Sequence, residues 1–278
     1  MPVRIALVQF QSQRYDIEAN LAKADRFVER AVELHVDIVV FPEMFLTGWG
    51  PRIREMAARE EEIRTHFCTL AAQHGIDIIP GSFPELEADN LYNTAWYIDA
   101  GGNILMQYRK VYLWITEKER GTPGDGPVVC DTAYGRVGLA ICWDLAFPEL
   151  FRGMFRKGAD MVFCPSCWCA EDAGPGQALN AEAETLFVDS LCVARAFENE
   201  CAIAFINAAG QWPTEKASRT SIGHSQVTIP FQGPIARAAT NREELLVCSV
   251  DLSVRSVAEE AYGIRKDVSD PPVPEIST

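Results

Sequence analysis

Short apolar runs alternate with amphipathic stretches from one end of the chain to the other. Residues 3–10 and 36–41 are largely apolar and rich in β-branched side chains, as expected for strands buried on both faces. Between them, apolar residues recur at spacings of four and three, which predicts one face of a helix. These residues are Ile17, Leu21, Ala24, Val28 and Ala31. The alternation is typical of an α/β protein.

The rest of the chain repeats this pattern. Further helices are predicted over residues 54–74, 147–157 and 177–198. Further strands are predicted over residues 76–83, 94–98, 104–108, 128–130, 136–141, 161–164, 201–206, 227–229, 235–238 and 245–250. No linker or repeat interrupts the pattern, so we predict one domain over residues 1–265. Residues 266–278 form a predicted C-terminal extension, because their end is too rich in proline and polar residues to pack as an element.

Composition narrows the classes of partner. The chain has 278 residues, of which 48% are hydrophobic and 23% charged, which is enough for a large core and excludes a disordered or collagen-like chain. Thirty-nine acidic against 25 basic residues give a formal charge of −14. Such a field repels phosphate backbones and anionic lipid, so we expect neither nucleic acid nor a membrane as a partner.

The cysteines and the N-terminal segment suggest a compartment. MPVRIALVQFQ lacks the long apolar core of a signal peptide, and no window approaches the roughly 20 apolar residues of a membrane span. Nine cysteines on such a chain predict free thiols in the cytoplasm. Cys164, Cys167 and Cys169 are close enough to suggest a metal, but no nearby histidine or second cysteine pair would complete four ligands. We therefore predict packing thiols and no metal.

Three segments place a reactive side chain just after an apolar strand. Glu43 follows one strand, Lys110 ends another, and Cys142 lies between a strand and a predicted helix. A thiol at such a junction suits nucleophilic attack, because a helix N-terminus lowers the thiol pKa and offers N–H groups to an oxyanion. A carboxylate and an ammonium from other strands could supply the base and a charge stabiliser. Singly, each of these residues is more often structural.

The order of these segments carries a resemblance. FPEMFLTGW at 41–49, YRKVYLW at 108–114 and ICWDLAFPEL at 141–150 resemble the three signature segments of the nitrilase superfamily of carbon–nitrogen hydrolases. Four further stretches also match: YNTAWYID at 92–99, TPGD at 122–125, ENECAIAFINAAG at 198–210 and GHSQVTIPFQG at 223–233. The resemblance covers nearly the whole chain apart from the last two dozen residues.

The resemblance implies a fold and a set of site residues. The fold would be a four-layer α-β-β-α sandwich, assembled as a homodimer or larger homo-oligomer, with no cofactor. Glu43 would be the general base, Lys110 the oxyanion stabiliser and Cys142 the nucleophile. Many members carry a second glutamate before the PG of the third loop. Alignment of TPGD assigns that position to Glu117, with Glu119 close enough to leave the choice open.

The residues after the nucleophile point to a branch. Nitrilases usually carry CWE there, whereas Cys142-Trp143-Asp144 followed by FPE resembles the amidase and N-carbamoyl amine amidohydrolase branches. We therefore expect hydrolysis of a small amide through a cysteine thioester, giving a carboxylic acid or an amine plus ammonia. A small nitrile is the alternative substrate. Trp143 and Trp168 would border the pocket, although hydrophobic packing explains Trp168 equally well.

Two other interpretations of the function stay open. A pseudoenzyme or binding protein could share the fold, but a buried Glu–Lys–Cys cluster is costly to desolvate and gives a binding module no evident benefit. A Cys–His hydrolase would use His224 as its base. Arg195, Glu198 and Asn199 could bind substrate, but a structural ion pair near an oligomer interface is the better interpretation. Asn207 and His224 are interpreted as structural residues.

Overall fold

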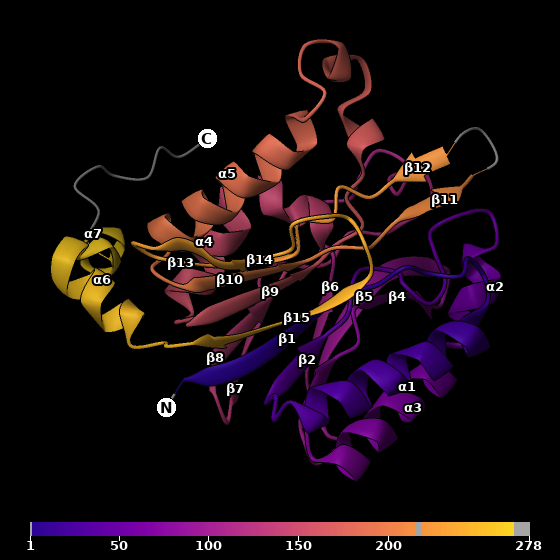
Figure 1. Ribbon diagram of the computed structural model, residues 1–278, viewed down its shortest axis with the longest axis horizontal. Helices are drawn as coiled ribbons and strands as arrows, with labels where there is room; N and C mark the ends of the chain where they lie inside the picture. Colours follow the sequence, from indigo (N-terminus) through magenta and orange to yellow (C-terminus); the bar gives the residue numbers. More distant parts are fainter. Residues whose placement is uncertain (1, 215–217, 270–278) are drawn as a thin grey trace.

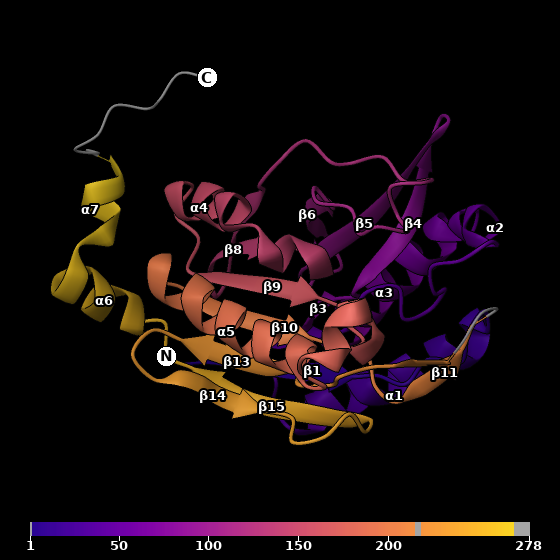
Figure 2. The ribbon, with the colours of Figure 1, turned by 90° about the horizontal axis from the view of Figure 1, so that it is seen from above.

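Two β-sheets packed face to face form the centre of the protein, and helices cover both outer faces (Figures 1 and 2). The computed structural model describes residues 2–214 and 218–269. Apolar side chains from the two sheets meet in one core, and a second core lies between the first sheet and its helices. This is the α-β-β-α sandwich that the resemblance implies.

The first sheet has seven strands within the described residues, in the order β15-β1-β2-β3-β5-β4, with β6 paired to β5. Strand β1 pairs in parallel with β2, and β2 with β3, whereas β15 joins β1 antiparallel. The strands are β1 Val3–Gln9, β2 Ile38–Val40, β3 Asp77–Ile79, β4 Ser82–Glu87, β5 Asn90–Ile98, β6 Ile104–Arg109 and β15 Glu244–Val250.

The second sheet has six strands in the described part of the chain, in the order β14-β13-β10-β9-β8-β7. Its central strands β8, β9 and β10 are parallel, so their carboxyl ends lie at one edge. The strands are β7 Val129–Thr132, β8 Gly135–Leu139, β9 Met161–Pro165, β10 Ala202–Ile206, β13 Gln226–Ile229 and β14 Gly233–Arg237. A separate small hairpin consists of β11 Gln211–Pro213 and β12 Ser218–Thr220.

Helices α1 (Ile17–Glu33) and α3 (Glu60–His74) cover the first sheet, and α4 (Pro148–Arg156) and α5 (Ala183–Glu198) cover the second (Figure 1). The shorter helices are α2 Ile53–Ala57, the 3₁₀ segments η1 Cys142–Ala146 and η2 Ala170–Ala178, and α6 Val254–Tyr262 and α7 Ile264–Ser269. Within residues 2–214 and 218–269, no helix is long and apolar enough to cross a membrane.

Most predicted elements are present, and several boundaries differ. The single helix predicted over 54–74 is wrong: α2 and α3 are separate. The break is hidden in the sequence because both helices bury apolar residues on one continuous pattern. The strand predicted over 76–83 is also divided, since Gly81 takes a left-handed φ of 69° and a Cβ there would overlap the carbonyl of Pro42. The predicted helix over 177–198 begins only at Ala183.

Six of the described elements were not predicted: β11, β12, η1, η2, α6 and α7. They are short, and most of them bury few side chains, so their hydrophobic pattern is weak. The domain boundary predicted after residue 265 falls inside α7, and residues 270–278 lie outside the described residues. The extension over 266–278 therefore stays a prediction.

Candidate active site

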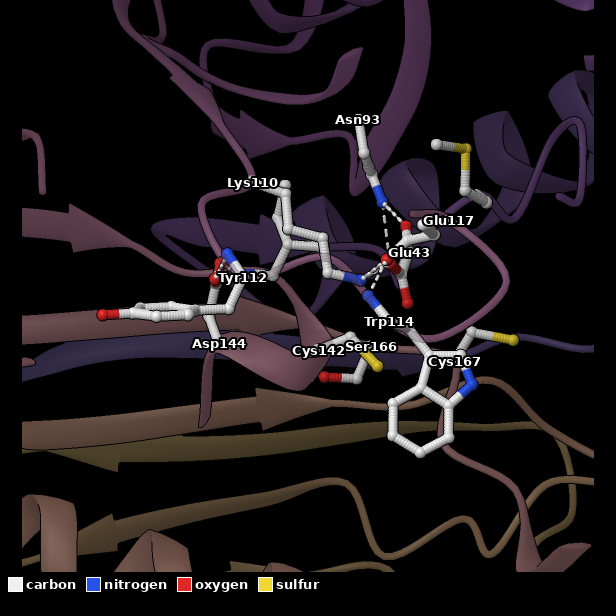
Figure 3. Close-up of polar contacts among 12 residues, drawn as sticks. Glu43, Asn93, Lys110, Tyr112, Trp114, Glu117, Cys142, Asp144, Ser166 and Cys167 are labelled. Carbon is white, nitrogen blue, oxygen red and sulfur yellow. Dashed lines mark hydrogen bonds and ion pairs between the residues drawn. The ribbon is translucent and has the colours of Figure 1, made fainter. Parts of the chain in front are cut away.

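The ends of strands from both sheets meet at one place, where the three predicted reactive side chains lie together (Figure 3). Glu43 follows β2, Lys110 directly follows β6, and Cys142 follows β8. The backbone N–H of Glu43 donates to the carbonyl of Ser166, which follows β9, at 3.3 Å. This bond ties the loop of the first sheet to a loop of the second, so the site depends on the packing of the two sheets.

Cys142 lies in a strained turn that a buried aspartate holds in place. Its φ is 47°, a left-handed value that residues other than glycine adopt rarely and mainly where surrounding structure enforces it. The Asp144 carboxylate accepts hydrogen bonds from the N–H of Ile141 at 2.8 Å, the N–H of Tyr112 at 2.8 Å and the hydroxyl of Tyr108 at 2.6 Å. Asp144 therefore fastens the Cys142 turn to the segment that carries Lys110.

Lys110 lies between two carboxylates. Its ammonium donates to Oε1 of Glu43 at 2.9 Å and to Oε2 of Glu117 at 2.6 Å, and all three side chains are buried. The backbone N–H of Trp114 also donates to Glu117, at 2.7 Å. Glu119 is exposed. Of the two glutamates that the sequence left open, the geometry favours Glu117 as the partner of Lys110.

Asn93 is a site residue that sequence reasoning missed. Its amide Nδ2 donates to Oε1 of Glu43 and to Oε1 of Glu117, both at 2.8 Å (Figure 3). Asn93 lies on β5 and is 1% exposed. Sequence reasoning had no signal for it, because the predicted strand began at residue 94 and both partners of the buried amide are distant in the chain.

Burial and charge set the protonation of this cluster. Burial opposes the Lys110 ammonium, but the carboxylates of Glu117 and Glu43 outweigh it and hold the pKa of Lys110 well above its usual value. Burial raises the pKa of Glu43, although the nearby ammonium counteracts it. Glu43 thus has the character of a base that takes up a proton more readily than an exposed carboxylate.

The predicted lowering of the Cys142 pKa is wrong. Burial, with the negative charge of Glu43 added, raises the pKa of this thiol well above its ordinary value, and Lys110 offsets only part of the effect. The short η1 segment does not reverse that balance. The resting residue is therefore a neutral thiol, hydrogen-bonded to the Glu43 carboxylate, and it needs that base in order to react.

A cavity of about 530 Å³ opens onto these groups. Glu43, Lys110, Glu117 and Cys142 line it. Five of the six tryptophans of the chain also line it, namely Trp49, Trp114, Trp143, Trp168 and Trp212. The cavity therefore joins a charged reactive end to a broad aromatic wall, a combination typical of small-molecule sites.

Trp143 and Trp168 both lie at this wall, with ring centroids 5.7 Å apart. Trp168 is 3% exposed, and its indole N–H donates to the carboxylate of Glu184. The ring is thus fixed by a buried polar contact while one face borders the cavity. Cys167 also lines the cavity, and its backbone N–H donates to the sulfur of Cys142.

The remaining polar residues singled out in the sequence lie outside the reactive cluster. Arg195 donates to the carbonyls of Leu145 at 3.1 Å and Ala146 at 3.2 Å and pairs with Glu198 at 2.8 Å, so it braces the η1 turn. His224 is not among the residues that line the cavity, and its ring lies 3.5 Å from Asp189. A Cys–His pair between Cys142 and His224 is therefore not formed.

Asn207 and Asn199 hold backbone. Asn207 donates to the carbonyls of Trp168 and Gly223 and accepts from the N–H of Trp168 at 2.7 Å, which positions the aromatic wall. Asn199 donates to the carbonyl of Arg195 at 3.0 Å. In the part of the chain that the structure describes, no three histidine, cysteine or acidic side chains are grouped so that they could hold a metal ion.

Comparison with known proteins shows the family of the chain. The carbon–nitrogen hydrolase family model matches residues 4–259, and the chain belongs to that family. The omega-amidase NIT2 of Homo sapiens is 31% identical over 92% of this chain and 90% of its own length. A probable nitrilase of Schizosaccharomyces pombe is also 31% identical, over 96% of this chain and 93% of its own length.

Solved structures show the same architecture. Nit3 of Saccharomyces cerevisiae, described as a member of the nitrilase superfamily, superposes with a TM-score of 0.80 at 28% identity and covers 94% of each chain. An amidase from Nesterenkonia sp. AN1, solved as a double mutant with acrylamide, superposes with a TM-score of 0.78 at 27% identity. That match covers 90% of this chain and 91% of the amidase. The protein is thus a carbon–nitrogen hydrolase in fold and in sequence.

Proposed function

We propose that this protein hydrolyses the amide bond of a small molecule through a thioester on Cys142. The observation that carries the proposal is the meeting of Glu43, Lys110 and Cys142 in a tryptophan-lined cavity. Glu43 serves as general base and acid, Lys110 stabilises the oxyanion, and Glu117 holds Lys110 in place. No cofactor takes part in the proposed steps.

The first half of the reaction makes the thioester. Glu43 accepts the thiol proton of Cys142 while the sulfur attacks the amide carbonyl carbon. The carbonyl oxygen becomes negative and is stabilised by the Lys110 ammonium and the backbone N–H of Trp143. Glu43 then gives its proton to the amide nitrogen, the carbon–nitrogen bond breaks, and ammonia leaves.

The second half regenerates the enzyme. Glu43 takes a proton from water as the water oxygen attacks the thioester carbonyl, and the same oxyanion site stabilises the intermediate. The carbon–sulfur bond breaks, the carboxylic acid leaves, and Glu43 returns its proton to the Cys142 sulfur. With an N-carbamoyl amine the same steps release ammonia and a carbamic acid, which loses carbon dioxide to leave the amine.

Amide substrates are favoured over nitriles by the relatives. The similar proteins include omega-amidases and an amidase bound to acrylamide, although one relative is a probable nitrilase. The cavity of about 530 Å³ is larger than a two-carbon amide needs, and its wall is aromatic. We therefore propose amides with an apolar group of several carbons rather than the smallest ones.

Ammonia release from a matched panel tests the function. The panel contains primary amides, N-carbamoyl amines and nitriles with the same apolar groups of increasing length. Wild-type protein is expected to act best on amides or carbamoyl compounds, and Cys142→Ala is expected to lose turnover and stay folded. Cys68→Ala changes a cysteine on α3, far from the cluster in sequence and outside the cavity lining, and should keep full activity. Equal activity in wild type and Cys142→Ala would refute the proposal.

We further propose that the protein is a homodimer or larger homo-oligomer in the cytoplasm. Four apolar side chains on α5 are exposed: Leu186, Phe187, Val193 and Phe197. Leu186, Val193 and Phe197 share one face of the helix, and an exposed apolar stripe of this kind is typical of an interface. All nine cysteines are free thiols, which supports a reducing compartment. Sedimentation velocity measures the assembly, and a monomer at micromolar concentration would contradict it.

A further inference from the structure

Asn93 closes a ring of hydrogen bonds around the reactive carboxylate. Its Nδ2 donates to Oε1 of Glu43 and Oε1 of Glu117, and Lys110 donates to Oε1 of Glu43 and Oε2 of Glu117. The two carboxylates are thus linked twice, once by an ammonium and once by a neutral amide. Figure 3 shows both donors pointing into the space between the carboxylates.

The two oxygens of Glu43 have different surroundings. Both Asn93 and Lys110 bind Oε1, at 2.8 and 2.9 Å. An oxygen that already accepts two strong hydrogen bonds is a poor proton acceptor, since protonation would break one of them. The oxygen Oε2 is therefore the one left for the thiol of Cys142, which is hydrogen-bonded to this carboxylate.

The orientation of the Asn93 amide is determined by its neighbours. The opposite orientation would aim the carbonyl oxygen at two carboxylates, which repel it. In the orientation observed, Oδ1 of Asn93 is buried without a hydrogen-bond partner among the described residues. A buried unpaired acceptor costs free energy, so a residue with a purely structural role would not need this arrangement. The cost of the unpaired Oδ1 is offset by the hydrogen bonds that the Asn93 amide donates to the two carboxylates.

The backbone makes Asn93 a rigid support. The Lys110 N–H donates to the Asn93 carbonyl at 2.8 Å, so a backbone hydrogen bond joins the two residues that donate to Glu43. Asn93 is not among the residues that line the cavity, and it therefore does not contact a bound substrate.

From this geometry we infer that Asn93 is a positioning residue, which fixes Oε1 of Glu43 so that Oε2 faces the thiol as the proton-accepting oxygen. The inference rests on the proposed function. It assigns to Asn93 a part in the chemistry through Glu43, with no contact to substrate. It also assigns different tasks to the two oxygens of the same carboxylate.

Removal of the amide donors should change how Glu43 titrates. Hydrogen bonds to the charged form favour ionisation, so the pKa of Glu43 should rise further in Asn93→Leu. The groups that face Glu43 are Lys110 after β6, Glu117 in the following loop, Cys142 on η1, Cys164 on β9 and Cys167 after it. None of them is changed in the variant, so a shift of the pH profile reports the loss of the amide.

Two variants and one control test the inference. Asn93→Leu removes both donors at similar volume, and Asn93→Asp keeps the shape, removes the donors and adds a carboxyl group. Asn20→Leu is the control: Asn20 is fully buried on α1, and its Nδ2 also donates to two acceptors, the carbonyls of Gln13 and Leu46. All three are expected to lose stability, which thermal unfolding measures, so stability alone does not distinguish them.

The first readout is amide hydrolysis as a function of pH. Both Asn93 variants should lower kcat by about ten- to a hundredfold, the effect of losing hydrogen bonds to a charged group, with little change in KM. The acidic limb of the kcat/KM profile should move to higher pH, further for Asn93→Asp than for Asn93→Leu. Asn20→Leu should keep the wild-type limb. An unchanged limb in folded Asn93→Leu would overturn the inference.

The second readout needs no turnover. Alkylation of Cys142 by iodoacetamide, followed by mass spectrometry of the peptide, measures how readily Glu43 removes the thiol proton. Alkylation should be slower at neutral pH in both Asn93 variants, and its pH dependence should move upward. The same alkylation profile in wild type and folded Asn93 variants would overturn the inference. If wild type and Cys142→Ala release ammonia equally while the alkylation shift is present, the proposed function fails and the inference about Asn93 stands.

Discussion

Two pairs of neighbouring glutamates in this protein have opposite surroundings. Glu43 and Glu117 are bridged by the Lys110 ammonium and the Asn93 amide. Glu200 and Glu259 face each other directly, and the guanidinium of Arg265 lies 3.8 Å from Glu259. One oxygen of each of these two carboxyl groups is buried without a hydrogen-bond partner among the described residues.

The difference shows what makes a buried carboxylate usable as a base. Burial, together with the hydrogen bond to Glu259 and its charge, raises the pKa of Glu200 to about 7, so Glu200 keeps its proton up to near neutral pH. In the first pair, the Lys110 ammonium lies between the two carboxylates and counteracts the effect of burial on Glu43. The same residue type thus holds a proton at one site and is poised to accept one at the other.

The largest effect is expected from Lys110→Met, which makes the first pair resemble the second. Without the ammonium, Glu43 and Glu117 should share a proton, and Glu43 should no longer take the proton of Cys142. Loss of the oxyanion stabiliser adds to this, so kcat/KM should fall at least about a hundred- to a thousandfold. The broken buried ion pairs should lower the free energy of unfolding by about 3–5 kcal/mol. Steady-state kinetics and urea unfolding measure both.

Lys157→Met controls for the removal of a lysine. Lys157 is exposed and donates to the carbonyl of Pro127 at 2.7 Å. That variant should keep wild-type activity and nearly all of the stability. Lys110→Met with more than about a tenth of wild-type kcat/KM would show that the ammonium is not needed at the reactive end.

A smaller effect, on stability alone, is expected from Glu200→Gln. The folded pKa of Glu200 is about 7, above the ordinary value of 4.5, so the folded state binds more protons than the unfolded chain between these values. Stability from this group is therefore complete below pH 4.5 and is lost as the pH rises toward 7, by up to about 3 kcal/mol. The glutamine variant should lose this pH dependence while keeping its activity.

Chemical unfolding at pH 5, 6, 7 and 8 measures this difference. Glu29→Gln, at an exposed position on α1, should follow the wild-type curve at every pH. If Glu200→Gln and wild type lose stability in parallel over this range, the raised pKa of Glu200 is wrong.

The smallest effect is expected from Arg59→Ala. Arg59 pairs with Glu18 at 2.8 Å and Glu62 at 2.6 Å, distances close to those at Lys110, but its side chain is 33% exposed. Solvent screens such pairs, so the free energy of unfolding should fall by less than about 1 kcal/mol, with no change in activity. A loss comparable to that of Lys110→Met would mean that burial does not separate the two clusters.

The sequence predicted the parts of the site that follow strand ends. Glu43, Lys110 and Cys142 each come at or just after an apolar run, and the sandwich brings those ends together. It could not separate Glu117 from Glu119, because that choice depends on how the loop after Lys110 folds back on it. Asn93 was missed since its partners are 50 and 24 residues away along the chain.

The pKa of Cys142 was predicted in the wrong direction for a related reason. Local sequence shows a strand followed by a helical segment, and a helix N-terminus favours a thiolate. Burial depends on the packing of both sheets, and the charge of Glu43 comes from a different strand. The break between α2 and α3 was hidden because apolar spacing continues through it. Long-range packing determines both the pKa of Cys142 and the division between α2 and α3, and a hydrophobic pattern does not contain that information.

Trapping of the acyl-enzyme tests the central claim most directly. Wild-type protein is mixed with its best amide substrate, quenched in acid within the steady state, digested and analysed by mass spectrometry. The peptide that contains Cys142 should gain the mass of the acyl group, and the peptide with Ala at this position from Cys142→Ala should not. Steady turnover of the amide with the acyl group on another residue would contradict the account. So would turnover of a slowly hydrolysed amide that leaves no acyl group on Cys142.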